Sequence, residues 1–341
     1  MWECGLFCKI FGNGPTASQI SIMKGLMKRW KDSDVTPEAL FWNRREVVRT
    51  LGFAGLGTLL ATSTQAGPLD WLTGGSKALD DLPRVSPETY PDATPYELFT
   101  GHNNYYEFSF DKEEVKHKVR SWTPADPWMI RIDGEVSKPM TLDLGDLMRR
   151  LGEPEERLYN FRCVEAWFGR FIWNGWPLHR LLKLVEPTSD AKFVRFVTYH
   201  GKDMPNWYRF GPYEEGLRID EAMHDLTLLT VGAYGHPLQK QNGGPMRIVV
   251  PWKYGLKSGK SLVRIELVRE QPQTTWEAKA PREYPFYSNV DPLVDHPRWS
   301  QAKHRVLGGR FWEKEPTQPF NGYAEEVAGL YKRMPVGQRL F

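Results

Sequence analysis

The residues with the clearest chemical potential lie in one short stretch, NFRCVEAW, at positions 160–167. It places Cys163 directly after Arg162 and two residues before Glu165. An adjacent cation lowers the pKa of a thiol and favours the thiolate, which is the form that binds metals. The stretch therefore predicts a metal-binding thiolate at Cys163.

Cys163 is expected to be the only thiol of the mature protein, because Cys4 and Cys8 lie in a predicted leader. In an oxidising compartment an odd thiol is buried and inert, paired between chains, or used chemically. One cysteine cannot make a structural zinc site, and no histidine spacing supplies the missing ligands. A soft thiolate as the sole protein ligand suits a metal whose other positions are filled by the sulfur and oxygen atoms of a cofactor.

The predicted leader combines a basic stretch, a mildly apolar run and a tail of small residues, in the order of a secretory signal. The pair Arg44-Arg45 precedes the apolar run 51–61, which is well short of the roughly 20 residues that span a bilayer. The arginine pair resembles the twin-arginine type of signal, the route of proteins that are exported already folded. The alternative is an amphipathic helix with a chance arginine pair. We expect residues 1–66 to be removed and the protein to be periplasmic.

The charge balance changes when the leader is set apart. The whole chain has 45 Lys+Arg and 42 Asp+Glu, a net charge of +3, and residues 1–66 hold 8 basic and 5 acidic side chains. Residues 67–341 therefore carry 37 of each sign. This neutrality gives no electrostatic reason to expect a nucleic-acid partner. The 40% of hydrophobic residues are typical of a globular protein and exclude disordered and fibrous classes.

The elements around the thiol are predicted from hydrophobic periodicity. Strands are expected at 128–132, with a turn at Asp133-Gly134 and a return strand from Glu135, and at 193–197, 226–231, 246–250 and 262–268. Helices are expected at 111–120, 142–151, 178–185 and 325–332. The pattern indicates a strand-rich mixed α+β fold, with residues 67–341 as a single compact domain.

Three stretches make the sequence recognisable: RCVEAW at 162–167, NGGPMRIVVPWKYG at 242–255 and VDHPRWSQA at 294–302. They resemble the molybdopterin-containing catalytic subunits of periplasmic protein-methionine-sulfoxide reductases (the MsrP family), which belong to the wider sulfite-oxidase fold family. The resemblance runs from about Asp34 to the C-terminus. It implies a sulfite-oxidase-type molybdopterin-binding oxidoreductase domain and one molybdenum-molybdopterin cofactor (Mo-MPT) per chain.

Carried over residue by residue, the resemblance makes Cys163 the molybdenum ligand, with the remaining coordination from the pterin dithiolene and oxo or hydroxo groups. The residues that it places around the pterin are Asn103, Tyr106, Glu107, Thr198, Asn242, Arg247, Ser258, Gly259 and Lys260. Arg247 and Lys260 can meet the phosphate of the cofactor, and the polar side chains can bind the edges of its ring. Without the resemblance, Arg247 would be a surface charge, and Lys253, Lys257 and Lys260 a solvated basic face.

Two side chains near the predicted ligand have competing interpretations. Glu165 is a candidate catalytic group for proton delivery or for setting the potential of the metal, and the alternative is a surface salt bridge. Trp167 is either a pocket wall or a core residue. The stretch 199–215 looks shorter than in close relatives and, if it lines the substrate mouth, it alters which sulfoxides enter.

The implied reaction is the reduction of methionine sulfoxide in oxidised periplasmic proteins by oxygen-atom transfer. The resemblance also implies a membrane-embedded haem-b electron donor (MsrQ-like). The chain has no Cys-x-x-Cys-His motif for a haem of its own, so an external donor is needed. Two alternatives remain. One is a sulfite-oxidase-like, small-sulfoxide or N-oxide activity at the same metal, and the other is a cofactor-free periplasmic binding module, against which the retention of Cys163 argues.

Overall fold

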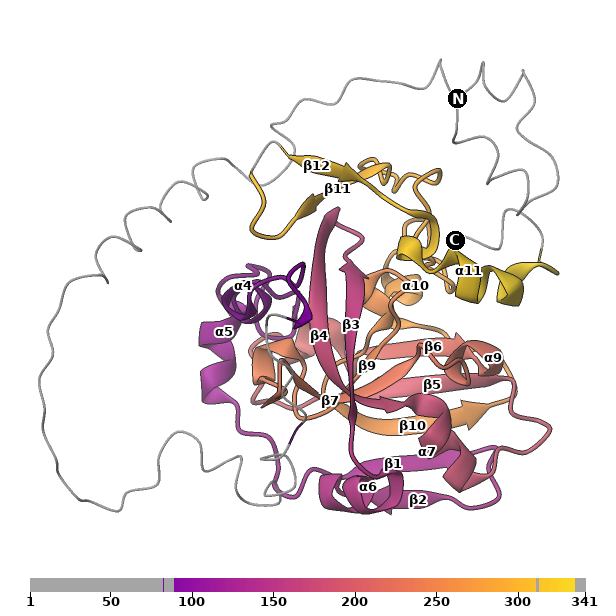
Figure 1. Ribbon diagram of the computed structural model, residues 1–341. Coiled ribbons are helices and arrows are strands. Elements are labelled where there is room, and N and C mark those ends of the chain that lie inside the picture. The colour runs from indigo at the N-terminus through magenta and orange to yellow at the C-terminus, as the bar shows by residue number, and fades with distance from the viewer. Residues whose placement is uncertain (1–81, 83–88, 311–312, 335–341) are drawn as a thin grey trace, which may run out of the picture. The chain divides into compact units, whose positions relative to one another are not determined.

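Two β-sheets form the framework of the computed structural model, which describes residues 82, 89–310 and 313–334 (Figure 1). All of these residues lie in one compact unit, Ala66–Phe341. The strand-rich mixed α and β class is confirmed. The predicted leader at residues 1–66 and its boundary with the mature chain lie outside the described residues and stay predictions.

The first sheet has five strands. Their order is β2 (Met140–Leu142), β1 (Ile130–Gly134), β10 (Leu262–Val268), β5 (Phe193–Thr198) and β6 (Glu214–Arg218). β1 pairs with β10 in parallel, and the other neighbours are antiparallel. Buried and half-buried side chains alternate along β5, as the period of two in a strand requires.

The second sheet contains the strands that carry the cysteine. Its main path is β12 (Lys314–Pro316), β11 (Lys303–Val306), β4 (Trp167–Pro177), β7 (Leu228–Ala233) and β8 (His236–Pro237), while β3 (Glu155–Arg162) pairs with β4 and β9 (Arg247–Val249) pairs with β7. β3 and β4 form a long antiparallel hairpin, paired from Glu155↔Gly175 to Arg162↔Phe168. Cys163 therefore lies at the tip of this hairpin, directly after β3.

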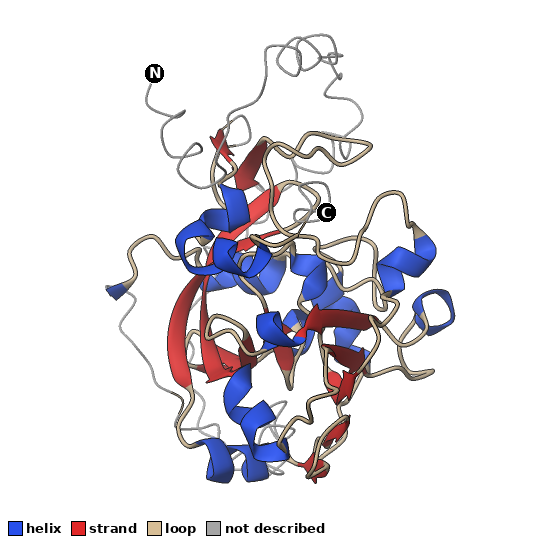
Figure 2. Cartoon of the chain, turned by 90° about the vertical axis from the view of Figure 1, so that its right-hand side faces the viewer, coloured by secondary structure: helices blue, strands red, loops and turns tan. Residues whose placement is uncertain are grey.

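The helices are short and lie among the strands (Figure 2). The α-helices are α4 (Tyr96–Gly101), α5 (Val115–Lys118), α6 (Leu144–Leu151), α7 (Leu178–Val185), α8 (Trp207–Phe210), α9 (Ile219–Ala222), α10 (Thr275–Lys279) and α11 (Ala324–Val327). The 3₁₀ turns are η6 (Val119–Ser121), η7 (Lys240–Asn242), η8 (Gly255–Lys257), η9 (Pro319–Gly322) and η10 (Ala328–Tyr331). α6 begins at a capping box between Asp143 and Asp146, which satisfies amide groups that the first turn leaves free. The helix predicted at 178–185 is confirmed at both ends.

The predicted turn at Asp133-Gly134 is wrong. Both residues belong to β1 and pair with β10, opposite Glu266 and Leu267. Asp133 faces Arg264 on β10, whose Nε lies 2.9 Å from its Oδ1. Gly134 is needed for close packing, since a Cβ there would lie 2.1 Å from the Leu267 carbonyl oxygen. The hairpin forms instead between β1 and β2, after a longer connection.

The remaining predicted elements are confirmed in outline. Strands form at β5, β7, β9 and β10, and α6 covers most of its predicted range. Residues 111–114 of the predicted helix 111–120 are not helical, and the observed helical stretch is Val115–Ser121. The last predicted helix is split into α11 and η10. The periodicity did not predict β3, β4, β11 and β12.

Lys253 and Lys257 do not form a solvated face, and that alternative is wrong for both. Their side chains are fully buried, with Lys253 Nζ 2.6 Å from Glu221 Oε1 and Lys257 Nζ 2.6 Å from Glu215 Oε2. Lys253 also donates to Asn289 Oδ1 at 2.8 Å. Burial raises the pKa of Glu221, but the ammonium of Lys253 and other hydrogen bonds outweigh it and hold the pKa below its ordinary value.

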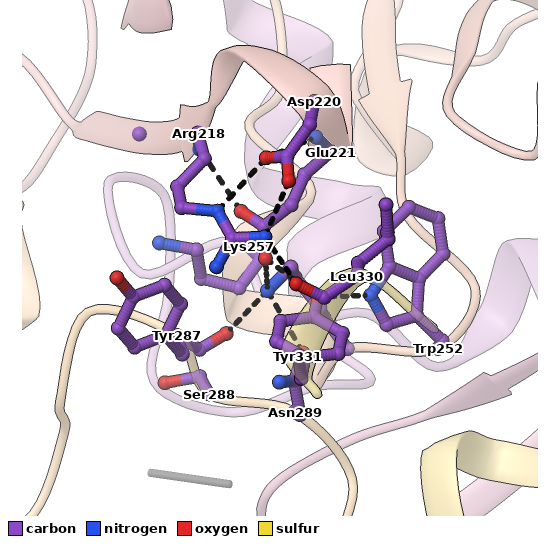
Figure 3. A network of polar contacts seen from close by, with 12 residues as sticks. Arg218, Asp220, Glu221, Trp252, Lys257, Tyr287, Ser288, Asn289, Leu330 and Tyr331 are labelled. Carbon is purple, nitrogen blue, oxygen red and sulfur yellow. Dashed lines mark hydrogen bonds and ion pairs between the residues drawn. The ribbon is translucent and has the colours of Figure 1, made fainter. Parts of the chain in front are cut away.

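The pair between Lys253 and Glu221 connects the segment after β9 with the C-terminal part of the described chain. Tyr331 donates to Glu221 Oε1 at 2.5 Å and accepts from Trp252 Nε1 at 2.8 Å (Figure 3). The Arg218 guanidinium lies over the Tyr331 ring, 5.2 Å from its centroid. The loop that follows β9 is therefore anchored to η10 by a fully buried polar network.

We predict that Lys253→Met destabilises the protein by about 3–5 kcal/mol, because it leaves the buried Glu221 carboxylate without its cation. Urea unfolding of the purified full chain measures the change. Lys138→Met is the matched control, since Lys138 pairs with Glu186 on the surface and exposed pairs contribute less than about 1 kcal/mol. Equal losses in the two variants would contradict this prediction.

Candidate active site

A cavity lies beside the tip of the β3–β4 hairpin. It holds about 980 Å³ of space free of protein atoms, including its open mouth. The predicted site residues that line it are Asn103, Tyr106, Glu107, Cys163, Glu165, Asn242, Arg247, Ser258, Gly259 and Lys260. Thr198 is not in the wall but lies behind it, with its Cγ2 3.6 Å from the position that a Cβ on Gly259 would take. The structure thus brings together side chains from segments up to about 160 residues apart.

Cys163 is buried, with 5% of its surface exposed, in a tight turn between β3 and β4. Its amide donates to the Trp167 carbonyl at 2.9 Å, and the Ala166 amide donates to the Cys163 carbonyl at 3.1 Å. Ala166 has a φ of 65°, in the left-handed region that costs energy for a residue with a side chain. The Cys163 sulfur accepts from Asn104 Nδ2 at 3.2 Å and from the Glu165 amide at 3.4 Å.

The prediction that a neighbouring cation lowers the pKa of this thiol is wrong as a net effect. Burial raises the pKa of Cys163 to about 12, and the Glu165 carboxylate raises it further. Lys112 and Arg162 lower it, but they offset the burial only in part. A thiol in this position becomes a thiolate when a cation compensates the buried charge, and a metal ion at the sulfur supplies one.

Glu165 forms a partly exposed salt bridge and also lines the cavity, and its catalytic role stays a prediction. Its Oε2 lies 2.8 Å from Lys112 Nζ, and both side chains remain about a quarter exposed. It also lines the cavity, where the Tyr106 hydroxyl donates to Oε1 and Asn104 Nδ2 donates to Oε2 at 3.3 Å. Burial raises the pKa of Glu165, but the Lys112 cation and these hydrogen bonds lower it more. Glu165 is therefore held as a carboxylate.

Trp167 also fits both of its interpretations, since it is buried in an aromatic cluster and lines the cavity. Its ring lies at a right angle to that of His102, with centroids 5.1 Å apart.

Arg247 supplies a buried positive charge to the cavity. It begins β9, and its guanidinium donates to the carbonyls of Asn242 and Ser258 at 2.6 and 3.1 Å. No carboxylate of the described residues forms an ion pair with it. Burial lowers the pKa of Arg247 to about 9. A cation held by neutral carbonyls in this way retains its attraction for an anion.

Lys260 brings a second cation to the same wall. Gly243 has a φ of 97°, and a Cβ on it would lie 2.7 Å from Lys260 Cγ, so the glycine makes room for the stem of this lysine. Burial and the Arg247 cation lower the pKa of Lys260 to about 7, while Glu107 and Cys163 raise it. Within the described part of the chain Lys260, too, lacks an ion pair with a carboxylate.

The cavity wall also offers polar groups without a partner. Asn242 donates to Asn103 Oδ1 at 2.8 Å and to the Phe99 carbonyl, but its own Oδ1 is buried and accepts no hydrogen bond. The amides of Gly259 and Lys260 donate none to any described residue. Unpaired acceptors, amides and two cations around one space fit a ligand that has both a phosphate and an amide-edged ring, such as molybdopterin.

Sequence reasoning missed several residues of the site. Asn104 directly follows the predicted site residue Asn103, and this adjacency could have marked Asn104 as a further site residue. Lys112 could not have been found in this way, because nothing in its local sequence connects it with Glu165. The wall also has aromatic residues that no motif marked, among them Tyr213, Trp276 and Tyr284.

Comparison with known protein families finds a match in the middle of the chain. Residues 116–276 match the family described as "Oxidoreductase molybdopterin binding domain". Among solved structures, the sulfane dehydrogenase SoxCD from Paracoccus pantotrophus is similar at 19% sequence identity, with a TM-score of 0.39. That similarity covers 45% of this chain and 41% of the SoxCD chain, so it spans less than half of either.

The chain thus carries an oxidoreductase domain that binds a molybdenum-molybdopterin cofactor. Asn103, Tyr106 and Glu107 precede the matched residues, so part of the wall is contributed from outside them. The described residues contain no cluster of three His, Cys, Asp or Glu side chains that could hold a metal ion.

We predict that Lys260 makes the stability of the cofactor-free protein depend on pH. Its folded pKa of about 7 is below the ordinary value of 10.5, so between these values the unfolded chain binds more protons and stability rises with pH. Lys260→Met therefore stabilises the cofactor-free protein below pH 7, and the gain shrinks toward pH 10. Urea unfolding of both proteins across this range measures it, and parallel pH profiles would contradict the assignment.

Proposed function

We propose that this protein is a molybdenum-dependent reductase that repairs exported proteins by reducing methionine sulfoxide to methionine. The observation that carries the proposal is the position of Cys163, whose sulfur lies in an open cavity between a cationic wall and the Glu165 carboxylate. The domain match supports molybdopterin-dependent redox chemistry, and the three stretches quoted from the sequence favour a protein sulfoxide as the substrate.

The bound cofactor supplies two-electron oxygen-atom transfer, and the protein holds and orients it. Cys163 would hold the molybdenum, and Arg247 and Lys260 would bind the phosphate together with the free amides of Gly259 and Lys260. Asn242 Oδ1 is available to a donor on the pterin ring. These residues would hold the cofactor at both the metal and the phosphate.

Sulfoxide reduction consumes protons, because the oxygen leaves as water. The groups next to the sulfur can hold and orient such a proton. The Tyr106 hydroxyl donates to Glu165, which Lys112 keeps ionised. Burial raises the pKa of Tyr106 above its usual range, and the Glu165 carboxylate adds to the effect. Tyr106 therefore keeps its proton and presents it beside Cys163, while Glu165 orients the hydroxyl.

The surroundings of the cavity suit a substrate larger than a free amino acid. The segment 199–211 is bound to the wall, because Asn206 donates to the carbonyls of Tyr106 and Glu107 at 2.8 and 2.9 Å. Two aromatic side chains reach into solvent here: Tyr208 of this segment, which is 65% exposed, and Phe110, which is 48% exposed and whose ring centroid lies 5.3 Å from that of Tyr106. We call Phe110, Tyr208 and Arg209, whose guanidinium lies over both rings, the aromatic rim.

The rim offers apolar surface to the polypeptide around an oxidised methionine. It supports the earlier hypothesis that 199–215 borders the entrance for the substrate.

The electron donor and the compartment belong to the same proposal. A membrane-embedded haem-b protein would supply electrons to the periplasmic face, where the twin-arginine leader would deliver the folded chain. Among the described residues, no helix has the length and apolar character needed to cross a membrane.

The function is tested with purified full-length protein loaded with about one molybdenum per chain, assayed with a chemical reductant on oxidised protein and on free methionine sulfoxide, and with an electron acceptor on sulfite. We expect turnover of the sulfoxides, and its loss in Cys163→Ser, since the thiolate is the single protein ligand. Sulfite oxidation without sulfoxide reduction would instead favour the sulfite-oxidase-like alternative. A stable protein that never contains molybdenum would favour the binding module.

A second prediction separates protein substrates from small ones. Tyr208→Ala removes a large exposed ring from the aromatic rim, so we expect kcat/KM for oxidised protein to fall about 10-fold, as for loss of an aromatic contact at an interface. Turnover of free methionine sulfoxide should not change. Met129→Ala is the control, because Met129 is exposed to a similar degree as Phe110 and does not belong to the aromatic rim. Equal effects on both substrates would exclude a role of the rim in protein recognition.

A further inference from the structure

The stretch 294–302 was singled out in the sequence, yet none of its residues lines the cavity. It lies behind the cysteine turn and contacts the backbone there. Trp299 Nε1 and Gln301 Nε2 both donate to the Val164 carbonyl, each at 2.8 Å. A carbonyl oxygen has two lone pairs, so these two donors saturate the acceptor that follows Cys163.

A third hydrogen bond ties the same stretch to the other side of the cysteine. Arg162 is fully buried, and its guanidinium donates to the Cys163 carbonyl and, at 2.8 Å, to Gln301 Oε1. Gln301 thus uses both ends of its amide, accepting from the residue before Cys163 and donating to the carbonyl after it. Gln301 therefore binds the Val164 carbonyl directly and holds the Arg162 guanidinium, which in turn binds the Cys163 carbonyl.

The two donors are themselves held in place. The Trp299 ring stacks on His296, with centroids 3.8 Å apart and planes within 6°, and Arg298 lies 4.8 Å from the indole. Asp295 Oδ1 accepts a hydrogen bond from the backbone amide of Gln301 at 2.7 Å. Contacts within the stretch 294–302 therefore orient the Trp299 and Gln301 side chains.

We propose that Trp299 and Gln301 are positioning residues that aim the Cys163 sulfur into the cavity by holding the Val164 carbonyl. The turn needs such support, because Ala166 has a left-handed conformation that surrounding contacts must stabilise. Groups that orient a metal ligand control the metal site without touching the metal. The proposal rests on Cys163 as the molybdenum ligand, which belongs to the proposed function.

The test uses the full-length, molybdenum-loaded protein and two variants that each remove one donor. Trp299→Phe keeps a ring that can stack on His296, and Gln301→Glu keeps the acceptor for Arg162 while it places an oxygen against the Val164 carbonyl. The readout is the visible absorption from thiolate-to-molybdenum charge transfer, which depends on how the sulfur is directed at the metal. We expect this band to shift or weaken in each variant and most in the double variant, with turnover lower by about 10- to 100-fold.

The matched control is Trp176→Phe, which removes an indole hydrogen bond of the same length, 2.8 Å, to the carbonyl of Gly152. Its spectrum should remain that of the wild type, although its unfolding midpoint falls as in the test variants. An unchanged band in the folded, loaded double variant overturns the positioning role if Cys163→Ser does change the band. If Cys163→Ser also leaves the band unchanged, the ligand assignment is wrong, and the proposed function fails together with the positioning role.

Discussion

A single buried thiol at the end of one β-hairpin is the constraint around which the described structure is arranged. Because the described residues hold one free thiol and no cluster of three His, Cys, Asp or Glu side chains that could bind a metal, the direction of that thiol has to be set by the backbone around it. The turn at 163–166 is strained at Ala166 and is gripped from behind by Trp299 and Gln301. In front of it, Asn104 reaches the sulfur from a third segment.

The basic residues from the start of β9 up to β10 fall into two groups, and only the folded structure distinguishes them. Lys253 and Lys257 are neutralised by buried carboxylates and act as anchors for the loop after β9. Arg247 and Lys260, close to them in sequence, form no ion pair with a described carboxylate, and burial is the main cause of their lowered pKa values. Basic residues within 14 positions of one another therefore have different roles. Lys253 and Lys257 stabilise the fold, and Arg247 and Lys260, which face the cavity, are available to an anionic ligand.

From the sequence, elements with regular apolar spacing were predicted correctly, and residues within recognisable motifs were predicted to lie together. α7 and β10 have regular apolar spacing and were predicted within a residue, whereas β3 and β4 were missed because polar side chains and an unbroken apolar run hide the alternation. All but one of the predicted site residues line the cavity, since short motifs hold them. The pKa of Cys163 could not be predicted, because burial, which sequence does not reveal, outweighs the adjacent arginine.

The residues matched to the molybdopterin-binding family do not include all the groups that bind the cysteine turn and the cavity wall. Asn103 and Asn104 come before position 116, and Trp299 and Gln301 come after position 276, yet all four bind residues inside that range. Recombination at these borders would carry the cysteine into a new protein without the groups that orient it. A fragment that keeps these contacts is therefore longer than residues 116–276, and has to include both Asn103 and Gln301.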